Sequence, residues 1–326
     1  MAAKKTVRSR LLELLEQNKG KILSGERIAE ELSCTRAAVW KAVRSLREEG
    51  YEIEAGSNRG YMLSENSNLL AEEGIRPLLN KQEVYLQVCP EVDSTNRAAK
   101  EAAVSGKAHH GSAVLAQEQN SGRGRKGRGF YSPKDSGFYL SVILEPKGSL
   151  RENLILTAQA AAAVHKAVKE VTGISLDIKW VNDLYYHGKK VCGILTEAVT
   201  DFESGEIQFA VVGIGLNLYE PENGFPLELD GIAGALYKKR EEAEGINRNW
   251  LAASVINSLL KETQELKLPP EYIQHNLVPG HRIQILDGQQ TRFADALEIC
   301  QDGRLKIREE DGTETLLCYG EVSLKI

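Results

Sequence analysis

The stretch Ser121–Gly129 restricts the possible folds of this chain most strongly, because it cannot pack as a helix or a strand. Its sequence, SGRGRKGRG, contains four glycines and four cations, and no acidic residue lies between Gln119 and Lys134. Closely spaced glycines let the backbone approach a ligand, while arginine and lysine donate hydrogen bonds to phosphate and carboxylate oxygens. Composition leaves two interpretations open: an RNA-binding or solvated segment, and a loop that orders over an anion.

Length and composition indicate a globular protein of several domains. The 326 residues are 42% hydrophobic, which is enough apolar material for about two or three domains with buried cores. No apolar run is long enough to cross a bilayer and the first residues lack a signal-peptide core, so we expect a cytoplasmic protein. The five cysteines include no C-x-x-C pair, which argues against a zinc site or a disulfide framework. We expect reduced, mostly buried thiols.

Charge is distributed unevenly along the chain. Residues 1–50 contain eleven lysine or arginine residues against seven glutamates, although the net charge of the whole chain is −5. A basic N-terminal module therefore precedes an acidic body. Such a module is a candidate for nucleic-acid binding.

A helix-turn-helix pattern occupies the basic module. The expected N-caps Ser24 and Thr35 begin two helices, and the second continues to about Glu48. Only residues 33–35 separate them, which is typical of a helix-turn-helix. Apolar side chains at helical spacing cover one face of the second helix. The candidate DNA-contacting residues on its other face are Arg36, Trp40, Lys41, Arg44 and Arg47.

A β-hairpin is expected directly after these helices. Strand-like alternation over 51–55 and 61–63 flanks the turn 56–60, which carries Arg59 at its tip. The pattern predicts a winged-helix DNA-binding domain over residues 1–65, with Arg59 as a further DNA-contacting residue. A small protein-interaction module with a solvated basic face is the alternative.

Several local elements are expected between the basic module and the glycine-rich loop and just after that loop. Residues 64–68 are polar and are expected to be a linker, and residues 69–79 to form a short helix that Pro77 interrupts. Strands are expected over residues 84–88, before Pro90, and over residues 137–144.

Residues 66–279 alternate between strand and helix patterns and are expected to form a mixed-sheet α/β domain. Polar groups recur where strands end, at 93–96, at Gln119, in the expected hairpin 179–190 and at Asn217. Taken singly, each group is better explained as a cap, a turn or a surface residue. Taken together they lie where an α/β domain holds a ligand, so the glycine-rich loop between two strands is expected to be an active-site loop.

Residues 280–326 change character to short alternating strands. The tight-turn dipeptides Asp287-Gly, Asp302-Gly and Asp311-Gly separate them. We expect a small C-terminal β-barrel. The predicted fold class is therefore a multidomain α/β (α+β) protein with a winged helix-turn-helix, a central mixed-sheet domain and this barrel.

Five sequence strings occur in the order typical of one family. They are D-S-T-N (93–96), G-R-G-R-K-G-R-G (122–129), K-W-x-N-D-L (179–184), K-x-x-G-I-L (190–195) and G-I-G-x-N (213–217). The chain resembles, over essentially its whole length, the bifunctional biotin protein ligases that also repress the biotin operon. The winged helix is similar to that of the regulatory subgroup. One departure is Val181, where the family usually has proline.

The resemblance implies roles for individual side chains. The implied biotin-binding residues are Ser94, Thr95, Asn96, Gln119, Arg123, Gly124, Arg125 and Lys190. The implied nucleotide-binding residues are Arg125, Phe130, Asn182 and Asn217. The implied catalytic residues are Lys190, Arg125 and Asp183.

The resemblance also implies an activity and its partners. The family activates biotin with ATP and Mg²⁺ to biotinyl-5′-AMP, and transfers biotin to one lysine of a biotin carboxyl carrier protein. The loop would exclude water from the adenylate. The adenylate-bound form would be a homodimer that binds operator DNA. Two alternatives are a biotin-sensing repressor without enzymatic activity and a lipoate or octanoate ligase.

Overall fold

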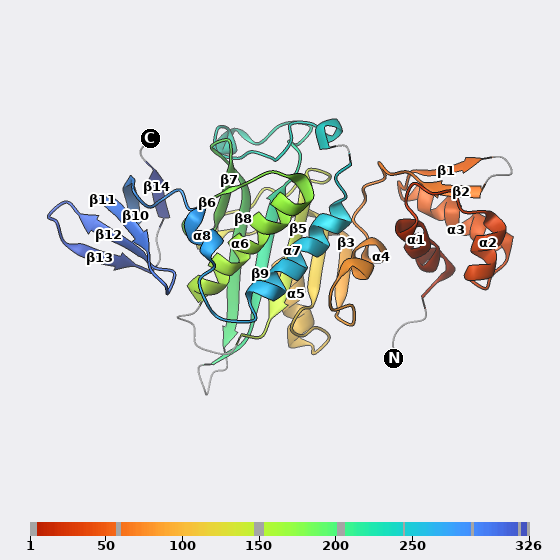
Figure 1. Cartoon of the computed structure of the whole chain (residues 1–326), viewed down its shortest axis with the longest axis horizontal. Coiled ribbons are helices and arrows are strands. Elements are labelled where there is room, and N and C mark those ends of the chain that lie inside the picture. The colour runs from red at the N-terminus through yellow and green to blue at the C-terminus, as the bar shows by residue number, and fades with distance from the viewer. Residues whose placement is uncertain are drawn as a thin grey trace. The chain divides into compact units, whose positions relative to one another are not determined.

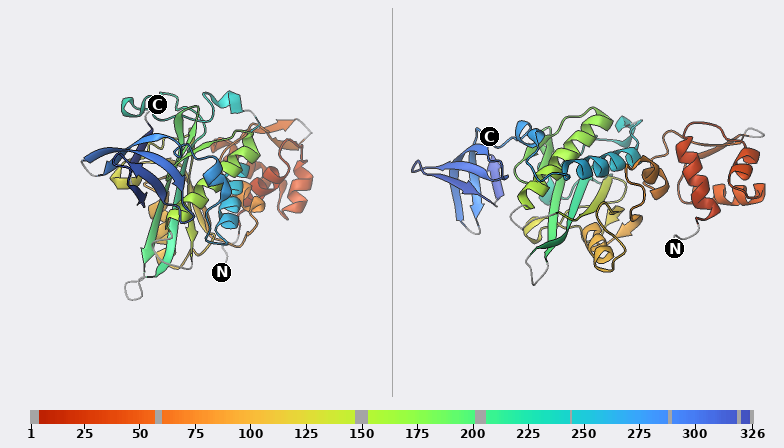
Figure 2. Two further views of the ribbon diagram at one scale, coloured as in Figure 1. Left: turned by 60° about the vertical axis from the view of Figure 1, so that its left-hand side comes forward. Right: turned by 60° about the horizontal axis from the view of Figure 1, so that its bottom comes forward.

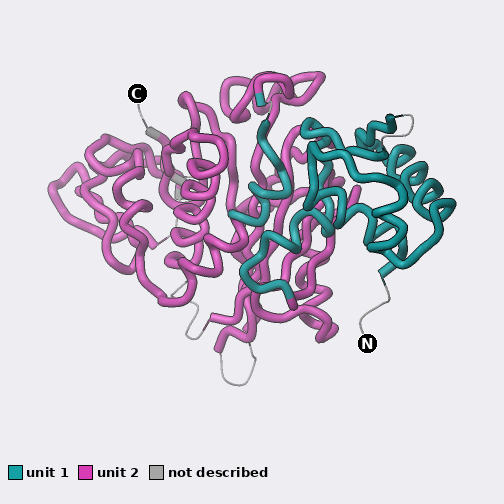
Figure 3. Tube along the Cα trace, turned by 45° about the vertical axis from the view of Figure 1, so that its right-hand side comes forward, with its two compact units in different colours: residues 1–82, 243–254 teal, residues 83–242, 255–326 magenta. Residues whose placement is uncertain are grey.

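The computed structural model describes residues 5–56, 60–146, 153–200, 206–243, 245–287, 290–318 and 321–324. The chain divides into two compact units (Figure 3). Unit 1 comprises residues 1–82 and 243–254, and unit 2 comprises residues 83–242 and 255–326. The division into domains at 1–65, 66–279 and 280–326 stays a prediction from the sequence.

Unit 1 contains the winged helix-turn-helix. Its first elements are α1 (Val7–Gln17), α2 (Gly25–Glu31), α3 (Arg36–Glu48), β1 (Ile53–Gly56) and β2 (Gly60–Leu63) (Figure 1). Both predicted N-caps form, because the Ser24 hydroxyl accepts from the Arg27 N–H at 3.1 Å and the Thr35 hydroxyl accepts from the Ala38 N–H at 3.2 Å. Each cap satisfies one backbone donor of the first helical turn.

The apolar faces of these helices meet in one core. The buried side chains include Leu11, Leu12, Leu15, Val39, Val43 and Leu46. The strands β1 and β2 pair antiparallel, with Ile53 opposite Leu63, and so add the predicted wing. Arg59, expected at the wing tip, lies outside the described residues. The predicted winged helix-turn-helix is confirmed.

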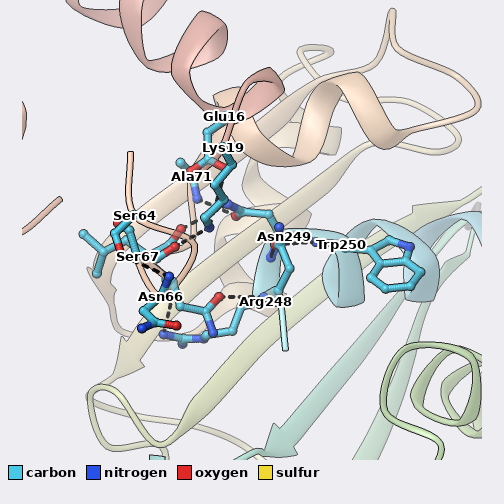
Figure 4. Close-up of polar contacts among 12 residues, drawn as sticks. Glu16, Lys19, Ser64, Asn66, Ser67, Ala71, Arg248, Asn249 and Trp250 are labelled. Carbon is cyan, nitrogen blue, oxygen red and sulfur yellow. Dashed lines mark hydrogen bonds and ion pairs between the residues drawn. The ribbon is translucent and has the colours of Figure 1, made fainter. Parts of the chain in front are cut away.

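A network of hydrogen bonds orders the chain after the wing (Figure 4). The Asn249 side chain accepts from the Ala71 N–H at 2.9 Å and donates to the Leu69 carbonyl at 3.2 Å. The Asn68 side chain accepts from the Arg248 N–H at 2.8 Å. A Cβ at Gly74 would lie 2.3 Å from Asn249 Nδ2, so this close packing requires a glycine. The polar segment expected as a linker is therefore held by specific bonds within unit 1.

The helix expected over residues 69–79 is shorter than predicted. It consists of α4 (Glu72–Ile75) followed by a 3₁₀ turn, η1 (Arg76–Leu78). Pro77 lies in the 3₁₀ turn, where its missing N–H needs no helical partner. The α-helix therefore ends before the proline, which is the interruption predicted at Pro77.

Unit 2 contains a seven-stranded mixed sheet. Its strands are β3 (Leu86–Val92), β4 (Ala113–Gln119), β5 (Gly137–Leu144), β6 (Asp177–Lys179), β7 (Asp183–Tyr186), β8 (Lys189–Thr200) and β9 (Ile207–Asn217). They lie in the order β3-β4-β5-β9-β8-β7-β6, with β3 and β4 parallel and the other neighbours antiparallel. Helices α5 (Thr95–Val104) and α6 (Asn153–Thr172) lie along the sheet (Figure 1). The predicted mixed-sheet domain is confirmed.

The strand expected over residues 84–88 begins later and continues to Val92, through Pro90. Proline cannot donate to a sheet ladder and is tolerated on edge strands. β3 is an edge strand, so Pro90 does not break it. The sequence pattern alone placed a loop at this proline, because it does not reveal which strand is at the edge.

The rest of unit 2 comprises two helices and a second sheet. α7 (Arg248–Glu262) enters unit 2 at Val255, and α8 (Pro270–Gln274) follows. A small antiparallel sheet, drawn in blue in Figure 2, contains the remaining strands. They are β10 (Arg282–Asp287), β11 (Gln290–Ile299), β12 (Leu305–Glu309), β13 (Glu314–Leu317) and β14 (Glu321–Leu324), in the order β13-β12-β11-β10-β14. The Trp180 indole N–H donates to the Gly303 carbonyl at 3.0 Å and so joins this sheet to the segment after β6.

Two further expectations concern the whole chain. Among the described residues, every helix is too short or too polar to cross a membrane. All five cysteines are free, but only Cys192 is buried and Cys318 is exposed. The expectation of mostly buried thiols is therefore wrong, because Cys34, Cys89 and Cys300 are only half-buried.

Candidate active site

One cavity of about 600 Å³ in unit 2 brings the predicted site residues together. The twelve residues expected to bind biotin or nucleotide, or to take part in catalysis, all line it: Ser94, Thr95, Asn96, Gln119, Arg123, Gly124, Arg125, Phe130, Asn182, Asp183, Lys190 and Asn217. They come from the start of α5, the end of β4, the glycine-rich loop, the hairpin of β7 and β8, and the end of β9. Their individual roles stay predictions.

Asn96, in the first turn of α5, is bonded to the sheet. Its Oδ1 accepts from the Ser141 hydroxyl at 2.6 Å, and its Nδ2 donates to a Glu197 carboxylate oxygen at 2.7 Å. A Cβ at Gly213 would lie 2.1 Å from Asn96 Oδ1, so β9 needs glycine at that position. These bonds hold the start of α5, and with it Ser94, against the sheet at the cavity wall.

Gln119 connects the start of α5 to the far end of the glycine-rich loop. Its Oε1 accepts from the Thr95 N–H at 2.9 Å and from the Thr95 hydroxyl at 3.1 Å. Its Nε2 donates to the Ser132 hydroxyl at 2.9 Å. Ser94 is the N-cap residue of α5 but makes no side-chain cap bond, so the free donor of the first turn goes to Gln119 instead.

The loop over residues 121–129 is ordered and closes on itself. At its neck the Phe130 N–H donates to the Gly122 carbonyl at 2.9 Å, and nearer its tip the Gly124 N–H donates to the Arg128 carbonyl at 2.7 Å. Lys126, at the tip, has a φ of 55° in the left-handed region. Residues 121–129 contain one 3₁₀ turn, η2 (Arg125–Gly127), but no α-helix and no β-strand, as predicted from the glycines.

Two cations reach the cavity from distant parts of the sequence. Arg125 Nη1 donates to Asn182 Oδ1 at 3.2 Å, and Lys190 Nζ lies 2.7 Å from Asp183 Oδ1. Asn182 also donates to the Ile194 carbonyl at 2.9 Å, which fixes its amide. Both cations are therefore oriented before a ligand arrives, and an anionic ligand would compete with Asp183 for Lys190.

The aromatic ring of Phe130 lies against glycines of the central strands. A Cβ at Gly215 would lie 2.4 Å from Phe130 Cε1, and a Cβ at Gly193 would lie 3.0 Å from Phe130 Cε2. Glycines within β8 and β9 therefore make room for this ring. The group that approaches these two glycines is a side chain of the protein itself, and both glycines also line the cavity.

Asn217 is buried, and its Nδ2 donates to the Gly234 carbonyl at 2.9 Å. The Lys190 N–H donates to the Ile232 carbonyl at 2.8 Å, from the same segment. Asn217, predicted to bind nucleotide, and Lys190, predicted to be catalytic, thus hold residues 232–234 along the cavity edge.

Several residues at the cavity carry no motif that the sequence could have revealed. Val322 and Ser323 of β14 line it, although this strand begins more than a hundred residues after Asn217. The buried Tyr272 hydroxyl of α8 donates to the Val181 carbonyl at 3.0 Å and supports the backbone before Asn182. Burial raises the pKa of Tyr272 well above its ordinary value, so the hydroxyl stays a donor.

The candidate DNA-contacting surface belongs to α3 of unit 1. Arg36, Trp40, Lys41, Arg44 and Arg47 are all exposed. The Arg44 guanidinium lies 5.9 Å from the centroid of the Trp40 ring and 2.9 Å from Glu48. Arg47 differs from the others, because its Nε donates to the Ile53 carbonyl at 2.8 Å and so supports β1.

Family comparison agrees with these two regions. Residues 88–217 match the Biotin/lipoate A/B protein ligase family, and residues 7–62 match an HTH domain. The chain is 34% identical to the bifunctional ligase/repressor BirA of Bacillus subtilis, an alignment that covers 95% of this chain and 97% of the relative. It is 28% identical to the bifunctional ligase/repressor BirA of Escherichia coli, over 98% of each chain.

A solved structure extends the comparison to the fold. The biotin protein ligase of Aquifex aeolicus in complex with biotin and ATP is 27% identical, with a TM-score of 0.58 over 74% of this chain and 98% of that chain. The resemblance that the sequence strings indicated is therefore confirmed. The chain belongs to the bifunctional biotin ligase/repressor family, as a biotin protein ligase that carries a helix-turn-helix domain.

Proposed function

We propose that this protein joins biotin and ATP to form biotinyl-5′-AMP, transfers the biotin to one lysine of a biotin carboxyl carrier protein, and in its adenylate-bound form represses transcription. The observation that supports the chemistry best is the convergence of two oriented cations, Arg125 and Lys190, in one cavity. A carboxylate that attacks a phosphate needs such cations, because both reactants are anions.

In the first half-reaction, the biotin carboxylate attacks the α-phosphorus of ATP and pyrophosphate leaves. Arg123, Arg125 and Lys190 would stabilise the negative charge that builds on the phosphoryl oxygens. Lys190 would exchange its ion pair with Asp183 for a phosphate or carboxylate oxygen. No protein nucleophile is needed, because the substrate carboxylate is already a nucleophile.

Magnesium would enter with the nucleotide. No group of three or more histidine, cysteine, aspartate or glutamate residues in the described part of the chain could hold a metal ion. Mg²⁺ commonly takes one or two carboxylates together with substrate phosphates and water. Asp183 fits this pattern as the protein ligand, and the ion would neutralise phosphate charge when bound.

In the second half-reaction, the acceptor lysine attacks the carbonyl carbon of the mixed anhydride and AMP leaves. Until the acceptor arrives, the anhydride must be kept from water. The glycine-rich loop over residues 121–129 is suited to this role, because it lines the cavity and its Arg125 side chain donates to Asn182 across it.

Repression would use the winged helix of unit 1. The exposed cations of α3 would contact DNA phosphates and bases in a major groove. A homodimer would present two such helices to a two-fold symmetric operator, and binding of the adenylate would favour the dimer.

The test is incubation with biotin, ATP, Mg²⁺ and a carrier-domain fragment, followed by mass spectrometry of the acceptor. We expect the acceptor mass to increase by one biotinyl group, and operator DNA to be bound only when biotin and ATP are both present. An unmodified acceptor with adenylate-dependent DNA binding would indicate a repressor without ligase activity.

A competition arm addresses acyl specificity, because the matched family includes lipoate ligases. Lipoate and octanoate are added in excess over biotin. We expect biotin to be transferred in preference to both. Preferential transfer of lipoate or octanoate would overturn the biotin assignment.

A further inference from the structure

We infer that Ser132 is a positioning residue for biotin binding, which acts through Gln119. Ser132 lies in the return from the glycine-rich loop to β5, and no sequence motif singled it out. The inference rests on the proposed function, because it takes Gln119 as a biotin-binding residue. Ser132 lies at the neck of the loop, away from the cationic tip.

The hydroxyl of Ser132 makes two hydrogen bonds in a buried position. Its Oγ accepts from Gln119 Nε2 at 2.9 Å and donates to the Phe130 carbonyl at 2.9 Å. The residue is only 4% exposed, so water does not readily replace either bond. The backbone adds a third link, from the Gln119 N–H to the Ser132 carbonyl at 3.0 Å.

These bonds define which way the Gln119 amide points. Thr95 presents an N–H and a hydroxyl to Oε1, and Ser132 presents an oxygen to Nε2. Rotating the amide by 180° would place its NH₂ against the Thr95 N–H, with two donors facing each other. The second N–H of Nε2 has no acceptor among the residues that the structure describes, and Gln119 lines the cavity. It is therefore available to an acceptor oxygen of biotin.

Close packing makes the neck of the loop a fixed point. A Cβ at Gly122 would lie 2.4 Å from the Phe130 carbonyl oxygen and 2.7 Å from Ser132 Oγ. The loop tip beyond Gly122 can then change position while Ser132 keeps the Gln119 amide and the Phe130 backbone in place. Ser132 thus couples biotin recognition to the base of the loop.

The first experiment compares Ser132→Ala with the wild-type full-length protein. Without the hydroxyl, the Gln119 amide can rotate away from its donor orientation. We expect the Kd for biotin in the absence of ATP, measured by calorimetry, to rise about tenfold, as for loss of one oriented hydrogen bond. We expect the KM for biotin to rise similarly, with kcat at saturating biotin and the KM for ATP changing less than about threefold.

Ser136→Ala is the matched control. Ser136 is also buried, and its hydroxyl bonds to the Pro133 carbonyl at 3.1 Å and to the Tyr139 hydroxyl at 3.2 Å, away from Gln119. We expect its biotin Kd to stay within about twofold of wild type. Thermal denaturation of both variants measures the general loss of stability. If Ser132→Ala does not fold, Ser132→Cys provides a near-isosteric replacement with a weak donor.

A double mutant identifies the route of the effect. If Ser132 acts through Gln119, Gln119→Ala with Ser132→Ala will bind biotin no more weakly than Gln119→Ala alone. Ser132→Thr, which keeps the hydroxyl, should restore most of the affinity lost in Ser132→Ala. Additive losses, an equal loss in Ser136→Ala, or an unchanged Kd in Ser132→Ala would each overturn the inference. Absence of biotin binding by the wild-type protein would instead overturn the proposed function.

Discussion

Positive charge is organised differently in the two regions that carry function. On α3 of unit 1, the cations come from one short stretch of sequence, and Arg36 and Lys41 project into solvent. In the cavity of unit 2, Arg125 and Lys190 come from segments 65 positions apart, and each is held by a polar neighbour. The first arrangement suits a repeating polyanion, and the second suits a small ligand held in one geometry.

This difference decides how each region responds to mutation. Exposed cations on one helix should contribute nearly independently to the free energy of DNA binding, because each would contact its own phosphate. We expect the cavity groups to act as a set, because Lys190 is held by Asp183 and Arg125 by Asn182 within one cavity. Loss of one cavity cation should therefore have a larger effect than loss of one α3 cation.

The largest effect is expected for Lys190→Ala. Removing the cation should lower the rate of adenylate formation by about a hundred- to a thousandfold, because the charge that develops on the phosphoryl oxygens loses its partner. Quench-flow measurement of biotinyl-5′-AMP in a single turnover checks this. Lys189→Ala removes the adjacent, exposed lysine and should leave the rate unchanged. Normal adenylate formation in the Lys190 variant would show that the cavity cations do not act as a set.

Arg125→Ala should mainly affect retention of the intermediate. Its bond to Asn182 closes the loop over the cavity, so the variant should still form adenylate but release it into solution. We expect free adenylate in filtrates to rise by about tenfold or more, with a smaller change in the rate of synthesis. Lys134→Ala removes an exposed cation just beyond the loop and is the control. Equal retention in both variants would contradict the prediction.

On α3, Arg36→Ala and Lys41→Ala should each weaken operator binding by about tenfold. Each should also reduce the slope of log K against log salt concentration by about one, because one fewer phosphate is neutralised. Ligase activity should not change. Arg47→Ala should weaken binding less, because this guanidinium is bonded to the Ile53 carbonyl. Fluorescence anisotropy at several salt concentrations measures all three. An equal loss of affinity in Arg47→Ala and Arg36→Ala would show that Arg47 contacts DNA as strongly as Arg36, despite its bond to Ile53.

The smallest effect concerns acid sensitivity of unit 2. Burial, and then the neighbouring His275, lower the pKa of His165, whose ring lies 4.1 Å from the His275 ring. A depressed histidine pKa favours the neutral form in the folded state. The contribution of His165 to the free energy of unfolding is therefore fully present above the unfolded-state pKa of about 6.5. It is lost as the pH falls through the lowered folded-state pKa, because the unfolded chain takes up the proton more readily. Lys169 and Glu271 are the other charged groups that act on it.

His165→Gln should remove this titration while keeping a donor for the Leu176 carbonyl, 2.9 Å from His165 Nδ1. We expect the fall in Tm between pH 6.5 and 5 to become smaller by about 3 °C. Differential scanning calorimetry at both pH values measures it. The same Tm difference in wild type and variant would show that another group controls the acid response.

Local features of the sequence predicted the elements of both regions well. The N-caps Ser24 and Thr35, the buried stripe of α3 and the boundaries of β5 depend on neighbours in the chain, and the structure confirms them. The errors lie where distant context decides. Pro90 stays within β3 only because that strand is at the sheet edge, and cysteine burial depends on which faces are covered.

The candidate site divides in the same way. The family strings identified the segments that line the cavity, because each string carries its own polar groups. Ser132, Tyr272 and Ser323 carry no such signal, since their positions depend on how the loop, α8 and β14 return to the central sheet.

By itself, the sequence determined the winged helix, the glycine-rich loop and the family to which the chain belongs, because these follow from short patterns of residues. Only the tertiary structure decided that Arg125 faces Asn182, that Lys190 faces Asp183, and that Ser132 orients Gln119. The physical reason is that hydrogen bonds act over about 3 Å. Pairs far apart in the chain meet only after strand order and register bring their backbones together.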